Sequence, residues 1–432
     1  MSRNNLIIIA LTIFLFNSCA DKRLNSPKSQ ITKKSIIKDY EKENEYLLYA
    51  LDLKARGNYK NSAKYFTTLY KKTKKLIYIK EAIENYIILK DLNSLKSMID
   101  LALKDYPNNL VLNRYLVAYY VDNRDFLKAK TVVEKLLKIK KDEKNLELAG
   151  VVYSGLKDYK FALKYFQSAY NIDQNEQALM KLTNLLYNNL DQKSDAISYL
   201  ETHIRLKGCG EMACYRLLQI YGEEKNVDAL ISTYKRLYQE KSRYEFGKRL
   251  VELYFYQNKL NLAIDFLKKT DLDDEMLLDA YITNKDYKLA KELANRLYDQ
   301  TGDSKFLAKS AIIEYELMSN KSDLKSLQSI LDKLDRAIKD ISDPTLFNYL
   351  GYLLIDHDIN IKKGIELVKK ALKIEPDNLF YLDSLAWGLY KDGKCQEAYD
   401  ILKDKMSENK EQEIKMHFEK IKKCLEAIKN DS

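Results

Sequence analysis

The sequence predicts an all-α protein, a superhelical solenoid of about 11 helix-turn-helix repeats followed by a C-terminal capping helix. Three observations support this fold class. Stretches of the chain superpose on one another at intervals of about 34 residues, which is typical of stacked helix pairs. Only 12 Gly and 4 Pro occur among 432 residues, too few for the turns of a β-rich fold. Apolar residues recur at helical spacing from residue 43 onward.

Residues 1–18 are interpreted as a lipoprotein signal peptide. The apolar run Leu6–Phe16 contains 11 residues, too few to span a bilayer but suited to the core of a signal peptide. The sequence FNSC that ends at Cys19 resembles the lipobox of bacterial lipoproteins, so we expect Cys19 to carry lipid such as palmitate. Ala20 replaces the Asp that retains many lipoproteins at the inner membrane, which favours an outer-membrane anchor facing the periplasm. Ordinary secretion with a free Cys19 is the alternative.

Residues 19–42 are expected to form a basic, flexible tether. Residues 20–80 contain 16 Lys or Arg and 6 Asp or Glu, so nearly all of the net charge of +10 lies close to the anchor. This charge, which includes Lys71, Lys72, Lys74 and Lys75, suits anionic lipid head groups or cell-wall polymer. A solvated tether and helix face is the alternative. Nucleic-acid binding is disfavoured, because export would keep the protein away from nucleic acid.

The repeats occupy residues 43–406, with divergent units over 43–341 and two well-matched units over 342–406. The second helix of a unit opens with a Gly or Asp-aromatic turn, as at Asp158. A small residue such as Ala162 follows, and an apolar residue such as Phe166 lies on the same helix face four positions later. Repeat starts are expected near residues 43, 76, 110, 143, 177, 211, 244, 271, 344 and 379, with a longer irregular unit across 304–340.

These recurring residues resemble the tetratricopeptide repeat (TPR). The final two units, FNYLGYLLIDHDINIKKGIELVKKALKIEPDN and LFYLDSLAWGLYKDGKCQEAYDIL, are similar to the end of large lipid-anchored TPR proteins of Gram-negative envelopes, the LbcA-like and NlpI-like adaptors. The resemblance implies a non-catalytic adaptor that delivers cell-wall hydrolases to a processing protease. A structural or assembly component of a flagellar motor, pilus secretin or outer-membrane assembly machine is the alternative.

The resemblance also implies a peptide-binding groove, because the first helix of each repeat lines the concave face in this family. In the last two units the groove positions are Asn348, Tyr352, Asp383, Trp387 and Tyr390. Aromatic residues beside an Asn and an Asp suit an extended or helical peptide. On this interpretation, Trp387→Ala weakens partner capture and hardly changes melting. Packing of the three aromatic residues between helices is the alternative.

Residues 407–432 are expected to form a helix that caps the repeat stack. Its apolar residues fall on one stripe at helical spacing: Ile414, Phe418, Ile421, Leu425 and Ile428. Capture of a partner by the same stripe is the alternative.

Four cysteines follow Cys19, an even number that suits an oxidising compartment. Cys209 and Cys214 flank a turn and are placed for a local disulfide, whereas a Cys395–Cys424 bond would join the capping helix to the last repeat. Two pairs of buried reduced thiols are the alternative. We expect no zinc site, because such a site needs more ligands close by.

The sequence does not indicate an enzyme. It contains three histidines, His203, His357 and His417, and no HExxH, GxSxG or glycine-rich phosphate loop. His203 falls where other repeats have Ala or Leu, so it is expected to be packed. We expect no cofactor, and a cell-wall hydrolase built on the helical stack would lack a segment for its catalytic domain. Protein partners and a membrane anchor are expected instead.

Overall fold

The structure is a computed structural model that describes residues 41–405 and 411–430. Within these ranges it consists of 23 α-helices and one short 3-10 helix, η1 (Lys403–Lys405), and contains no strand. None of the helices in the described ranges is long and apolar enough to cross a membrane. The predicted signal peptide, Cys19 and nearly all of the tether lie outside the described residues.

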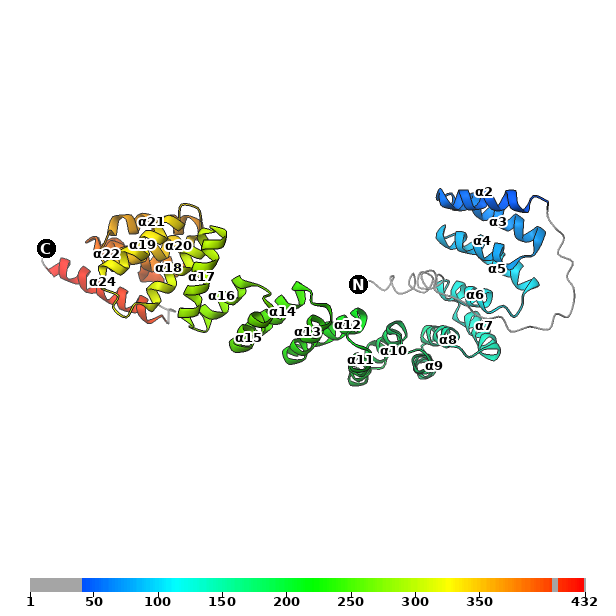
Figure 1. Ribbon diagram of the computed structural model, residues 1–432. Coiled ribbons are helices and arrows are strands. Elements are labelled where there is room, and N and C mark those ends of the chain that lie inside the picture. The colour runs from blue at the N-terminus through cyan, green and yellow to red at the C-terminus, as the bar shows by residue number, and fades with distance from the viewer. Residues whose placement is uncertain (1–40, 406–410, 431–432) are drawn as a thin grey trace. The chain divides into compact units, whose positions relative to one another are not determined.

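The chain divides into two compact units, residues 1–240 and 241–432, which are described separately. The helices of the first unit are α2 (Glu43–Ala55), α3 (Tyr59–Thr73), α4 (Leu76–Ile88), α5 (Leu92–Asp105), α6 (Leu110–Asp122), α7 (Phe126–Ile139), α8 (Glu143–Gly155), α9 (Tyr159–Ile172), α10 (Glu176–Asn189), α11 (Lys193–Lys207), α12 (Glu211–Glu223) and α13 (Val227–Lys241). From α2 to α12, helices that follow one another along the chain lie side by side (Figure 1).

The second unit contains the remaining helices, which also follow one another in chain order. They are α14 (Tyr244–Tyr256), α15 (Leu260–Thr270), α16 (Asp274–Thr283), α17 (Tyr287–Thr301), α18 (Ser304–Leu317), α19 (Leu324–Ala337), α20 (Pro344–Asp356), α21 (Ile361–Ile374), α22 (Leu379–Lys391), α23 (Cys395–Leu402) and α24 (Gln412–Asn430). The last of these, α24, packs against α22 and α23.

In the described ranges the helices form 11 successive pairs, from α2–α3 to α22–α23, and α24 follows the last pair. This confirms the predicted all-α solenoid of helix pairs with a C-terminal capping helix. Most pairs begin within a residue of the expected start; the eighth begins at Asp274, three residues later than expected. The segment expected to be irregular is an ordinary pair, α18 and α19, whose connection over 318–323 is longer than most.

The Asp-aromatic turn of the repeats is a helix N-cap. At the start of α9, the Asp158 side chain accepts a hydrogen bond from the Phe161 backbone N–H. The preceding residue, Lys157, has a φ of 61°, which turns the chain sharply between the two helices of the pair. The Asp side chain thus satisfies one of the backbone N–H groups that a helix start leaves without a partner.

Small residues let the paired helices approach closely. In α9, Ala162 is fully buried, and Phe166 lies against Gly150 of α8, where a Cβ atom would be 2.4 Å from the Phe166 ring. In the second unit, a Cβ at Gly351 of α20 would lie 2.8 Å from the Gly364 carbonyl oxygen of α21. These contacts fix how the first helix of each pair sits on the second.

Buried apolar residues form clusters shared by neighbouring pairs. One cluster spans α2 to α6 and another α6 to α9 in the first unit, while two further clusters join α18–α21 and α20–α24 in the second. Each pair therefore buries its apolar surface against its neighbours in sequence, as a repeat stack requires.

Candidate functional site

The five residues of the predicted groove lie on two neighbouring first helices, α20 and α22. Asn348 and Tyr352 lie four residues apart on α20, as do Asp383 and Trp387 on α22. Both helices begin at defined caps. Asp343 accepts hydrogen bonds at the start of α20 with Pro344 in its first position, and Asn378 caps α22.

Trp387 is the centre of this site and is 4% exposed. Its ring stacks on Tyr390, with centroids 5.0 Å apart, and on His417 of α24, with centroids 4.1 Å apart. Its Nε1–H donates a hydrogen bond of 3.0 Å to Asp356 Oδ1, and Lys420 Nζ lies 5.0 Å from the ring centroid. Stacking and cation–π contacts therefore join Trp387 to the C-terminal helix.

A buried hydrogen bond between a histidine and an aspartate links α22 to the same helix. His417, 1% exposed, lies with Nδ1 2.9 Å from Oδ2 of Asp383, which is 6% exposed. The N–H group donates to the carboxylate, while the second carboxylate oxygen, Oδ1, is buried without a hydrogen-bond partner. α24 thus provides a hydrogen-bond donor to only one of the two carboxylate oxygens of Asp383.

α20 contributes a third link. The Tyr352 hydroxyl donates a 2.5 Å hydrogen bond to Glu413 Oε1 at the start of α24. Burial, followed by this bond to Glu413, raises the pKa of the Tyr352 hydroxyl, so it remains a donor at neutral pH. Asn348 is half-buried, and its Oδ1 atom is buried without a partner.

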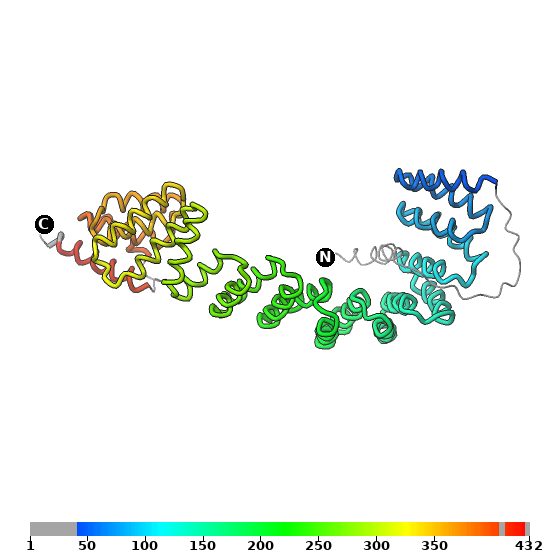
Figure 2. The backbone as a smooth tube through the Cα atoms, viewed as in Figure 1, coloured from blue at the N-terminus to red at the C-terminus, as the bar shows by residue number. Residues whose placement is uncertain are grey.

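These contacts correct the expectation of an open groove. The capping helix α24 packs against α22 (Figure 2) and reaches α20 through the bond between Tyr352 and Glu413. Asp383 and Trp387 are buried, and His417 of α24 contacts both side chains. Trp387 packs between helices, as the alternative interpretation of the aromatic residues predicts. A partner would reach these side chains only if α24 moved away.

The apolar stripe of α24 faces the stack. Ile414, Ile421 and Leu425 are buried, and the Phe418 ring stacks on Tyr399 of α23 with centroids 5.4 Å apart. The side chain of Ile428, the last predicted member of the stripe, lies outside the described side chains. Sequence reasoning missed His417, although it lies three residues after Ile414 and four before Ile421, on the same stripe.

The four cysteines are joined in two disulfides. Cys209 pairs with Cys214 across the turn before α12, with Cα atoms 5.6 Å apart. Cys395, at the start of α23, pairs with Cys424 of α24, with Cα atoms 6.1 Å apart. The second bond ties α24 to the last helix pair.

The other two histidines are structural. His203 is buried, and its Nδ1 lies 2.9 Å from the Tyr170 hydroxyl; burial lowers its pKa, which favours the neutral ring. His357 Nε2 lies 2.9 Å from the Tyr315 hydroxyl. The packed role expected for His203 agrees with this placement.

In the first unit, ion pairs link the first helices of neighbouring pairs: Lys54–Glu81, Arg114–Asp142 and Lys181–Glu147. Two lysines of the expected basic patch are also paired, Lys74 with Asp105 and Lys75 with Glu43. These pairs reduce the charge that this part of the unit offers to an anionic surface.

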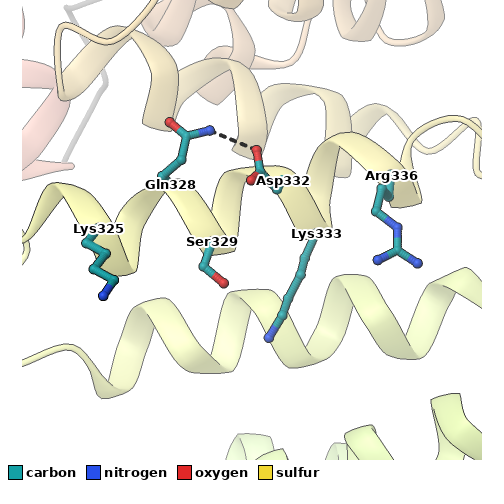
Figure 3. Close-up of a pocket in the computed structure, with 6 residues that line it drawn as sticks. All are labelled: Lys325, Gln328, Ser329, Asp332, Lys333 and Arg336. Atoms are coloured by element: carbon teal, nitrogen blue, oxygen red, sulfur yellow. Dashed lines mark hydrogen bonds between the residues drawn. The ribbon is translucent and has the colours of Figure 1, made fainter.

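Two surface hollows accompany these features. One in the first unit is lined mainly by α5 residues, with Lys71 and Tyr119 at its sides. The other is lined by six residues that all lie on α19 (Figure 3). Two of its three cations have partners, since Lys333 pairs with Glu314 and Arg336 donates to the Tyr298 hydroxyl. Neither hollow forms a converging set of groups for chemistry.

Asp122, at the end of α6, is expected to make the stability of the first unit depend on pH. Burial raises the pKa of its carboxyl to about 6, and Oδ1 is buried without a partner. In the unfolded chain the pKa is about 3.9, so ionisation of Asp122 penalises the fold above about pH 6 and not below about pH 4. We therefore expect Asp122→Asn to raise the melting temperature at neutral pH but not at pH 4. An equal gain at both pH values in thermal melts would contradict this assignment.

No protein-family model matches the chain. The chain is similar to the TPR repeat-containing protein PA4667 of Pseudomonas aeruginosa strain PAO1, with 34% identity over 71 residues. This stretch is 16% of the present chain and spans only 12% of that protein.

Two solved structures illustrate the structural similarity. MamA from Desulfovibrio magneticus RS-1 has 16% identity and a TM-score of 0.36, covering 40% of this chain and 98% of its own. Yeast Tom70 has 12% identity and a TM-score of 0.36, covering 90% of this chain and 96% of its own. The fold assignment rests on the helix pairs themselves. The chain has a TPR-type repeat fold, a scaffold suited to protein–protein interaction.

Proposed function

We propose that this protein is a non-catalytic scaffold that binds protein partners at the bacterial cell envelope. Lipid on Cys19 anchors it to the outer membrane, with the repeats in the periplasm. One observation carries the binding role: the α20–α22 face holds an amphipathic helix, α24, by stacking, hydrogen bonds and apolar contacts. A surface that holds one helix in this way is suited to holding another.

The two disulfides support the proposed compartment. Paired cysteines persist in oxidising environments such as the periplasm and are rare in the cytosol. The pairs Cys209–Cys214 and Cys395–Cys424 therefore favour an exported protein, in agreement with the lipobox-like FNSC sequence at Cys19.

More specifically, we propose an adaptor that recruits cell-wall hydrolases to a processing protease. The resemblance of the last two repeats to envelope adaptors supports this role. The test is affinity purification of the full lipidated chain from native envelopes, followed by identification of the captured proteins. Recovery of a protease together with hydrolases supports the adaptor, whereas motor or secretin components would instead assign the chain to an envelope machine. Lysis of cell-wall material by the purified protein in a zymogram would contradict a non-catalytic role.

The anchor has its own test. Cys19→Ser removes the acceptor of the lipid, so we expect the protein to leave the outer-membrane fraction and appear in the soluble periplasmic fraction. Cys209→Ser provides a control that leaves Cys19 in place and is expected to keep the protein in the membrane fraction. Retention of the Cys19→Ser protein in the outer membrane would show that lipid on this residue is not the anchor.

A further inference from the structure

We propose that the face formed by α20 and α22 is a helix-binding site whose present occupant, α24, is displaceable. The partner is an amphipathic helix with the side-chain pattern of α24, and the Cys395–Cys424 disulfide controls its entry. This inference rests on the proposed scaffold function and specifies both the kind of partner and the regulation of the site.

α24 is held as a bound helical peptide would be. Its aliphatic side chains Ile414, Ile421 and Leu425 are buried and lie on one stripe. Between them, His417 stacks on Trp387 and bonds to Asp383. Such anchors on successive turns of one helix are the usual basis of helix recognition in a groove.

The polar contacts define the N-terminal half of the occupant. Glu413 accepts a hydrogen bond from Tyr352, and Lys420 lies over the Trp387 ring. A partner helix that fits therefore carries an acidic residue, then an imidazole four residues later, then a cation after three more. A buried aliphatic residue, Ile414 in α24, lies between the acidic residue and the imidazole, and two more, Ile421 and Leu425, follow the cation.

The site offers hydrogen-bond acceptors that α24 does not use. Oδ1 of Asp383 and Oδ1 of Asn348 are buried without hydrogen-bond partners, and each lies on a first helix of the site. Buried acceptors of this kind normally have a donor. A partner helix with an additional donor, such as an Asn or Arg side chain, would satisfy them and compete with α24.

The disulfide determines whether competition is possible. While Cys395 and Cys424 are joined, α24 cannot leave α23. Cys395 is buried and Cys424 is half-buried, so a dithiol reductant attacks the Cys424 sulfur and Cys395 leaves as a thiolate. The second thiol of the reductant then displaces Cys424. The protein gains two electrons and two protons as two thiols, and the reductant becomes a disulfide.

The probe for this site is a fluorescein-labelled synthetic peptide of residues 411–430 with Ser in place of Cys424. Three forms of the full chain are compared by fluorescence anisotropy. These are the oxidised natural sequence, the Cys395→Ser/Cys424→Ser variant, and that double variant with Ile421→Ala added. The added substitution weakens the chain's own α24, which otherwise competes at high effective concentration. We expect the triple variant to bind at least about ten-fold more tightly than the oxidised chain.

Trp387 supplies a second measurement, because it is the sole tryptophan of the chain. Release of α24 removes His417 from the ring face, so we expect the Trp387 emission to move to longer wavelength in the triple variant and to return on addition of peptide. The Cys209→Ser/Cys214→Ser variant is the matched control, since it loses a disulfide in the other unit. It is expected to show neither the emission shift nor peptide binding.

Three outcomes would overturn the proposal. One is equal peptide binding by the oxidised chain and the triple variant. Another is no binding by a triple variant whose circular dichroism shows intact helices. The third is a concentration-dependent dimer without peptide binding, which would assign the site to a second copy. Capture of an envelope partner by the oxidised chain alone would support the scaffold and overturn the disulfide control. Peptide binding without capture of any partner would support the helix site and contradict the proposed function.

Discussion

Trp387→Ala is expected to reduce the free energy of unfolding of the second unit by about 3–5 kcal/mol. The substitution removes a buried ring that stacks on both Tyr390 and His417. It also leaves Asp356 Oδ1 without the indole N–H that now donates to it. The cavity and the unpaired acceptor both penalise the folded state.

The measurement is thermal and urea unfolding followed by far-ultraviolet circular dichroism, since the variant lacks the only tryptophan. We expect the melting temperature of the second unit to fall by roughly 10 °C. Trp387→Phe retains an aromatic ring, so its melting temperature is expected to fall by less than that of Trp387→Ala. Tyr256→Ala is the surface control, because Tyr256 is 79% exposed. Unchanged melting of Trp387→Ala would restore the earlier expectation that this residue serves only partner capture.

Gly351→Ala is expected to destabilise the second unit by about 3 kcal/mol. Its Cβ would lie 2.8 Å from the Gly364 carbonyl oxygen and 2.8 Å from Val368 Cγ2. Since the first of these atoms belongs to the backbone of α21, the new methyl group can be accommodated only if α20 and α21 move apart. That movement disturbs the buried cluster shared by α20, α22 and α24.

Gly222→Ala is the matched control, because Gly222 also lies in a first helix and a Cβ there meets no atom within 4 Å. Ala is the better helix former by about 1 kcal/mol, so this variant is expected to melt at a slightly higher temperature. Urea unfolding of the two variants gives the comparison. Equal midpoints for Gly351→Ala and the natural sequence would show that the two helices do not depend on this close contact.

The repeat architecture could be predicted because its signals are local. A cap such as Asp158, a small residue such as Ala162 and an apolar residue such as Phe166 recur in many of the second helices, and each acts within its own helix or on its neighbour. Divergence was misleading over 304–340, where the long connection before α19 hid an ordinary pair, and at the eighth pair, which begins three residues later than expected. In the segment 304–340 the length of the connection between the two helices changes, while the helical pattern of apolar residues remains.

The state of the groove was harder to predict, because a segment outside the repeats determines whether the groove is open or covered. The spacing of Asp383 and Trp387 correctly places both side chains on one face of α22. What covers that face depends on how α24 packs after residues 406–410, and no local pattern specifies that arrangement. The contact of His417 with Trp387 spans 30 residues of chain and arises only in the folded unit.

The amino-acid sequence by itself determined the all-α class, the period of the helix pairs and the amphipathic character of the last helix. These properties follow from backbone geometry and from contacts between neighbours in the chain. Only the tertiary structure decided that α24 lies over Tyr352, Asp383 and Trp387 and that Cys395 pairs with Cys424. The physical reason is that an apolar helix face must be buried against another apolar surface, but the sequence of the helix does not specify which surface. The packing of the whole unit determines that surface.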